Sequence, residues 1–153
     1  MFVRLALANE VDEIICMSTA NAQETLSGEF VDPDYVRHTF QQYLDHATST
    51  FFVVEDRRKV IAFLQAYMFG YDYRAGLYTV QKVLYVKPEK RGSRAAVLLM
   101  KELVRWSKML GADRIEGGND NGFKSERTAK FLEHFGFKNV GFAMRLNLEN
   151  QNG

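Results

Sequence analysis

The stretch "VKPEKRGSRAAVLLMKELVRW", residues 86–106, decides the fold of this chain. A proline closes an apolar run, a basic turn with one glycine follows, and a long apolar-striped segment then begins. The first N–H groups of a helix carry a partial positive charge, so cations beside them are disfavoured. Either these cations form a solvated charge run, or a strongly negative group binds beside them. The cations of the turn are Lys87, Lys90, Arg91 and Arg94.

The segment after the turn has the periodicity of a helix with one buried face. Its apolar residues recur at spacings of three and four, which indicates core packing rather than a cofactor site. Gly111 stands where a helix end favours glycine, so we predict a helix from about Arg94 to Leu110. The apolar positions are Ala96, Leu99, Met100, Leu103, Trp106 and Leu110.

The turn itself has the features of a phosphate site. Gly92 permits backbone conformations closed to other residues, and Ala95 and Ala96 keep the first helical turn uncluttered. Free N–H groups at a helix start bind anions, and arginine can grip a phosphate with two hydrogen bonds. The sequence lacks both the Gly-Lys-Ser/Thr of a P-loop and the GxGxxG of a Rossmann turn.

The bulk properties predict one globular domain of 153 residues. A net charge of +1 argues against nucleic acid or an anionic membrane as a partner. The single cysteine, Cys16, suits a reducing cytosol, and no run approaches the roughly 20 apolar residues of a membrane span. We expect a cytoplasmic protein without a metal.

The whole chain reads as an α/β (α+β) fold in the order β-α-α-β-β-β-α-β-α-β-β. Early hairpins and later β-α-β crossovers predict a mixed central sheet of six to seven strands, flanked on both faces by about four helices. Asp32 and Pro33 are typical of a helix start. Strands are expected at residues 2–7, 51–55, 60–69, 77–86, 113–116 and, as a pair or one bent strand, 137–149.

Two segments carry a resemblance to a known family. Residues 83–115 resemble the acetyl-CoA-binding motif of the GCN5-related N-acetyltransferases (GNAT), which reads strand, (V/I)xP, Gln/Arg-x-x-Gly-x-Gly/Ala and helix. Arg94 stands where that family usually has glycine. Residues 125–148 resemble the family's C-terminal element, with Ser125 at its asparagine and Gly136-Phe137 at its closing Gly-Phe. The resemblance covers residues 1–149, which leaves 150–153 as a short polar tail.

The resemblance implies direct transfer of an acetyl group from acetyl-CoA to an amine. A backbone N–H near Tyr85 or Val86 would polarise the thioester, and one of Lys90, Arg91 or Arg94 would reach the ribose phosphate. A splay between strands 77–86 and 113–116 would open the channel. The residues implied in donor binding are Leu84, Tyr85, Val86, Arg91, Gly92, Ser93, Arg94, Ala95, Ala96 and Ser125.

The sequence departs from the family at its proton-transfer groups. Leu132 aligns with the frequent tyrosine that protonates the leaving thiolate, and leucine has no proton to donate. Glu116 is either a base acting through water or an ordinary strand-end carboxylate. We therefore keep two hypotheses, an acetyl-CoA-dependent N-acyltransferase and a non-catalytic acyl-CoA-binding or interaction module.

The acceptor amine, on a small molecule or a protein, would enter beside residues 21–32 and 69–76. Glu24, Glu29, Tyr71 and Tyr73 could form an acidic, aromatic-lined mouth for a cation, or could simply be polar loop residues. Exposed strand edges and the segment 142–148 make a homodimer plausible.

Overall fold

The computed structural model describes residues 1–25, 29–47, 49–118 and 122–148. These residues belong to two compact units, Met1–Gly117 and Gly118–Gly153. No helix within the described ranges is long and apolar enough to cross a bilayer.

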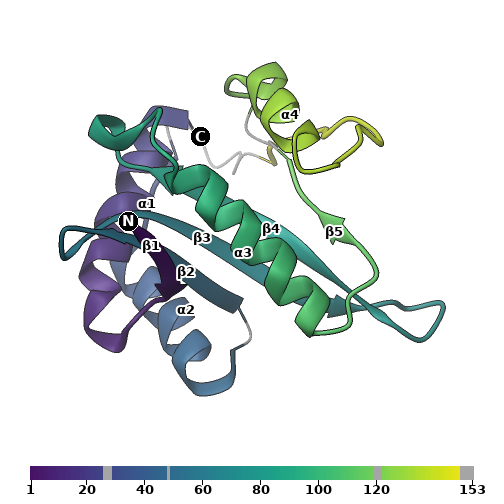
Figure 1. The fold of residues 1–153 in the computed structure, drawn as a ribbon, viewed down its shortest axis with the longest axis horizontal. Helices are drawn as coiled ribbons and strands as arrows, with labels where there is room; N and C mark the ends of the chain where they lie inside the picture. The colour runs from purple at the N-terminus through teal and green to yellow at the C-terminus, as the bar shows by residue number, and fades with distance from the viewer. Residues whose placement is uncertain (26–28, 48, 119–121, 149–153) are drawn as a thin grey trace. The chain divides into compact units, whose positions relative to one another are not determined.

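The first unit follows the predicted order of strands and helices (Figure 1). A 3-10 turn, η1 (Ala8–Glu10), precedes the first helix, and a second one, η2 (Pro88–Lys90), follows the fourth strand. The other elements are β1 (Phe2–Leu5), α1 (Val11–Thr25), α2 (Pro33–His46), β2 (Ser49–Asp56), β3 (Lys59–Gly70), β4 (Leu77–Val86), α3 (Ala95–Met109) and β5 (Ile115–Glu116).

The strands form one mixed sheet in the order β1-β2-β3-β4-β5. The first four strands are antiparallel neighbours, joined by short connections or by the α1–α2 segment. β4 and β5 are parallel, because α3 carries the chain back between them. The predicted mixed sheet is therefore confirmed.

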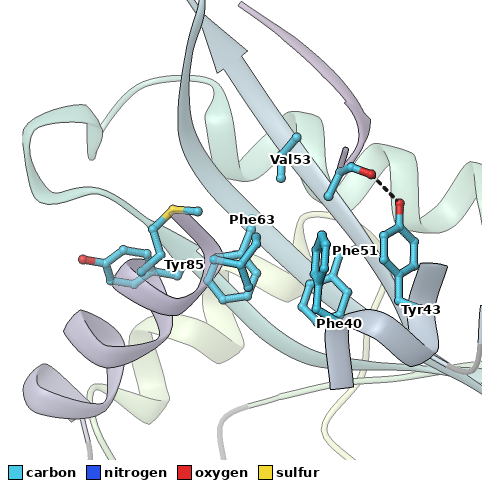
Figure 2. Close-up of a cluster of buried hydrophobic side chains, with 9 residues drawn as sticks. Phe40, Tyr43, Phe51, Val53, Phe63 and Tyr85 are labelled. Atoms are coloured by element: carbon cyan, nitrogen blue, oxygen red, sulfur yellow. Dashed lines mark hydrogen bonds between the residues drawn. The ribbon is translucent and has the colours of Figure 1, made fainter. Parts of the chain in front are cut away.

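The sheet is covered on both faces, because successive side chains of a strand point to opposite sides. Phe51 and Phe63 join one apolar cluster with Phe40 of α2 and Met17 of α1, whereas Phe52 packs on Trp106 of α3. Figure 2 shows the first of these clusters, and Figure 1 shows α3 lying across the sheet.

Two helix ends follow the sequence signals closely. The Asp32 carboxylate accepts hydrogen bonds from the amides of Asp34 and Tyr35, at 3.0 and 3.3 Å, so α2 begins at its predicted cap. Gly111 has φ +80° after α3, and Ala112 N–H donates back to the Ser107 carbonyl at 2.9 Å. The predicted helix after the basic turn is therefore confirmed at both ends.

The second unit contains α4 (Ser125–Glu133), again close to its prediction. The expected final strand pair is wrong for residues 137–148, which have no regular secondary structure, while residue 149 lies outside the described ranges. The sheet of the described residues thus has five strands rather than six or seven. Alternation indicates which side chains can share a face, but a strand also needs a neighbouring edge for its hydrogen bonds.

Candidate active site

β4 loses its second neighbour partway along its length. It pairs with β3 throughout but with β5 at only two positions, Thr79 with Ile115 and Val80 with Glu116. Just beyond them, consecutive β3 residues pair with β4 residues on either side of Lys82, which marks a bulge. A bulge bends its strand. Beyond Lys82, β4 therefore has one edge that pairs with no other strand among the described residues, which we call the free edge.

The backbone groups on the free edge belong to Leu84 and Val86. Lys87 N–H donates to the Ile61 carbonyl at 2.9 Å, so by alternation the backbone groups of Tyr85 also point at β3. Those of Leu84 and Val86 point the other way, and their amides have no hydrogen-bond partner in the described part of the chain. Of the two N–H donors that the sequence suggested, this geometry favours Val86 over Tyr85.

The chain leaves the free edge through the basic turn and enters α3. Gly92 has φ +83°, and nothing lies within 4 Å of where its side chain would begin. The Ser93 hydroxyl accepts a hydrogen bond from Ala95 N–H at 3.3 Å. The amides of Ala96 and Val97 have no such partner among the residues described. The helix start thus keeps the unpaired donors that an anion could use.

Three of the four cations of the turn are already paired with carboxylates from other elements. These ion pairs neutralise much of the positive charge at the helix start. The hydrogen bond from Lys90 lowers the pKa of Asp56. Arg94 is exposed and makes no ion pair within the described ranges. The pairs are Lys87 with Glu13, Lys90 with Asp56 at 2.8 Å, and Arg91 with Glu24 at 2.7 Å.

The two candidate catalytic residues lie in different settings. Glu116 sits opposite Val80, at the last paired position before the strands part, and its carboxylate lies 3.4 Å from the Arg114 guanidinium. The ring of Tyr85 is buried against Phe63, and this burial raises the pKa of its hydroxyl. Glu116 is therefore near the opening between the strands, whereas the Tyr85 side chain belongs to the core.

Two of the expected acceptor residues form a cluster at the β3–β4 turn. The Tyr71 hydroxyl donates to the Asp113 carboxylate and accepts from Arg114 at 3.0 Å, while Arg74 stacks 3.7 Å above its ring. Tyr73 lies 5.6 Å from Tyr71, between ring centroids, and stays largely exposed. Sequence reasoning missed the two arginines and Asp113, because they follow no motif or spacing.

The four expected acceptor residues do not form one group. Glu24 contacts Arg91 at the end of β4 that leads to α3, whereas Tyr71 and Tyr73 precede the other end of that strand. Glu29 is exposed between α1 and α2. Of the four, the structure brings only Tyr71 and Tyr73 into contact with each other.

Ser125, the last of the expected donor-binding residues, is exposed at the start of α4 in the second unit. Leu132, at the position of the family's tyrosine, is buried with 6% of its surface exposed.

Comparison with known proteins bears on the family and the fold of this chain. A sequence model of the acetyltransferase (GNAT) domain matches residues 47–139. A search of curated proteins found no match.

Solved structures share the fold at low sequence identity. A transcriptional regulator from Bacillus halodurans has a TM-score of 0.81 and 16% identity, over 95% of this chain and 98% of that one. Glucosamine-6-phosphate N-acetyltransferase from Arabidopsis thaliana has a TM-score of 0.76 and 16% identity, over 96% of this chain and 97% of that one. A predicted acetyltransferase from Clostridium acetobutylicum, solved with acetyl-CoA, has a TM-score of 0.78 and 16% identity, over 95% of this chain and 94% of that one. Because the domain match spans more than half of the 153 residues and the fold agrees, the chain belongs to the GNAT acetyltransferase family.

Proposed function

We propose that this protein transfers an acetyl group directly from acetyl-CoA to a primary amine of a small molecule or a protein. The observation that carries the proposal is the free edge of β4, which leads straight into the amide-rich start of α3. An extended ligand with amide groups and a phosphate end would find suitable partners along this path.

The residues of the path suit the two parts of such a donor. The backbone of Leu84 and Val86 can pair with the pantetheine amides as an added strand would. The turn from Arg91 to Ala96 offers backbone donors to the pyrophosphate, and Arg94, which is exposed and makes no ion pair within the described ranges, adds a cation. Ser125 is proposed as a further donor contact.

Acetyl-CoA, once bound, supplies an electrophilic carbonyl and a thiolate leaving group whose solution pKa is about 8.5. Leu84 N–H, the free-edge donor next to Tyr85 and farther from the phosphate end of the path, would donate to the oxygen on which negative charge develops during attack. Glu116 would accept the proton of the attacking amine through a water molecule. Since Leu132 has no proton to donate, the thiolate would leave without a positioned acid.

The acceptor side is proposed to favour a cationic amine. Glu29 and Tyr73 are exposed, and Tyr71 already stacks with an arginine side chain, as an aromatic ring does with a bound cation. Glu24 is held by Arg91 and would contact an acceptor only after this pair opens.

We further propose that residues 1–149 act as one acetyltransferase domain in the cytoplasm, that the protein forms a homodimer, and that neither nucleic acid nor a membrane is its partner. The near-neutral net charge of +1 supports the exclusion of nucleic acid.

Calorimetry with acetyl-CoA, followed by a thiol assay of CoA release with a panel of amines, tests the proposal. Binding and amine-dependent CoA release are expected; no binding of acetyl-CoA overturns it. The variant Arg94→Ala should weaken binding, whereas Arg105→Ala, which removes a cation paired with Glu102 farther along α3, should leave binding unchanged.

A second function is favoured by the apolar Leu132. A non-catalytic acyl-CoA-binding module would bind acetyl-CoA tightly and release no CoA with any amine. Tight binding without turnover across the panel would therefore replace the enzyme proposal with this one.

A further inference from the structure

Arg91 uses three of its nitrogen atoms on groups of this chain. Its Nε donates to the Val86 carbonyl at 3.1 Å. Its two terminal nitrogens donate to the two Glu24 carboxylate oxygens, each at 2.7 Å. The guanidinium also lies 5.6 Å from the centre of the Tyr85 ring. This side chain therefore links the last turn of α1 to the end of β4.

The contact between Arg91 Nε and the Val86 carbonyl lies at one end of the free edge. Val86 O lies on the free edge, at the point where the chain turns toward α3. An amide N–H from an added strand would need that same carbonyl as its acceptor. Arg91 therefore occupies one end of the path along which the donor is proposed to lie.

Glu24 holds the arginine in this position. A carboxylate that binds both terminal nitrogens fixes the plane of a guanidinium, and here it directs Nε at the carbonyl. The same two nitrogens are the ones that would grip a phosphate. A phosphate gripped by the same pair of N–H groups would therefore displace Glu24.

The other ion pairs of the turn differ in this respect. The Lys87–Glu13 and Lys90–Asp56 pairs make no hydrogen bond to the free edge. The Arg91–Glu24 pair is also open to water, with 40% and 30% of the two side chains exposed, so it can separate at low cost.

We propose that Glu24 and Arg91 form a latch over the free edge, which acetyl-CoA must open in order to bind. The inference rests on the proposed function. Donor binding replaces Nε at the Val86 carbonyl and takes the guanidinium away from Glu24. The Glu24 carboxylate at the end of α1 is then released from Arg91. Donor binding thereby makes this carboxylate available to a cationic acceptor.

The test compares the affinity of acetyl-CoA for wild type and Glu24→Gln by calorimetry. Glutamine keeps the size of the side chain but loses the charge that holds Arg91. Because an exposed ion pair contributes little, we expect binding to tighten by about two- to fivefold. Glu89→Gln is the matched control, since it removes a negative charge from the same turn without touching the pair. Its effect should be clearly smaller.

A double-mutant cycle separates the latch from general electrostatics. In an Arg91→Ala background the latch is already absent, so adding Glu24→Gln should leave the affinity unchanged. An equal tightening in both backgrounds, an effect no larger than that of Glu89→Gln, or weaker binding by Glu24→Gln would each overturn the latch while wild-type binding still supports the proposed function. Absence of binding by wild type overturns the proposed function and the latch together.

Discussion

Thr79 and Ser107 share a buried hydrogen bond at the point where β5 parts from β4. Their hydroxyl oxygens lie 2.6 Å apart, and both residues are almost fully buried. Thr79 also pairs with Ile115 of β5, so the contact ties α3 to the start of the opening. The perturbation is Thr79→Val, Ser107→Ala and the two changes together.

The expected free-energy changes are strongly non-additive. Each single change leaves one hydroxyl buried without a partner, which should lower the free energy of unfolding by about 1–3 kcal/mol. The double variant removes both hydroxyls and leaves none unpaired, and valine has nearly the shape of threonine. It should therefore cost less than the sum of the two single changes by about 1–3 kcal/mol.

Urea denaturation followed by fluorescence measures these values. Trp106 is the only tryptophan, precedes Ser107 in α3 and packs edge-on against Phe52 at 5.8 Å, so its emission reports on this region. A double variant that loses as much stability as the sum of the single variants would refute the reasoning. That result would mean that the Ser107 hydroxyl finds a helix carbonyl instead.

Three further predictions concern stability. Tyr43→Phe should lower the free energy of unfolding, measured in urea, by about 1–2 kcal/mol. The reason is that the Ala6 carbonyl loses the buried hydroxyl that donates to it at 2.7 Å. An unchanged free energy of unfolding would contradict this. Burial alone would raise the pKa of Glu10, but hydrogen bonds from Arg4 and a backbone amide outweigh it and lower this pKa. The stabilisation from Glu10 is therefore present above its unfolded pKa of about 4.3 and is lost as the pH falls through the lower folded value. In urea denaturation at several pH values, Glu10→Gln should make the free energy of unfolding fall less steeply with decreasing pH. A fall as steep as in wild type would count against this prediction. Gly76→Ala should cost about 1–3 kcal/mol in thermal melts, since its φ of +120° is a backbone conformation that residues with a side chain rarely adopt. Gly70→Ala, outside that region and with its nearest atom at 4.0 Å, should cost less, and an equal loss in the two variants would contradict this.

Local signals allowed most of the fold to be predicted from the sequence. The proline after β4, the periodic apolar face of α3 and the glycine at its end all act over a few residues. The Asp32-Pro33 start of α2 is of the same kind. The strand expected after residue 137 failed because its alternation says nothing about which edge would pair with it.

The sequence by itself determined that a cluster of cations stands at the start of a helix after a strand, and therefore where a phosphate-bearing donor is expected. Only the tertiary structure decided how those cations are used. Arg91 meets Glu24 across 67 positions of sequence, a pairing that depends on where the sheet carries α1 and that no local pattern encodes.

The tertiary structure also decided which backbone groups the free edge offers. The bulge at Lys82 and the β3–β4 register direct the backbone groups of Leu84 and Val86 toward the free edge and those of Tyr85 toward β3. The physical reason is that a shift of one residue in strand pairing reverses the direction of every backbone group and side chain that follows.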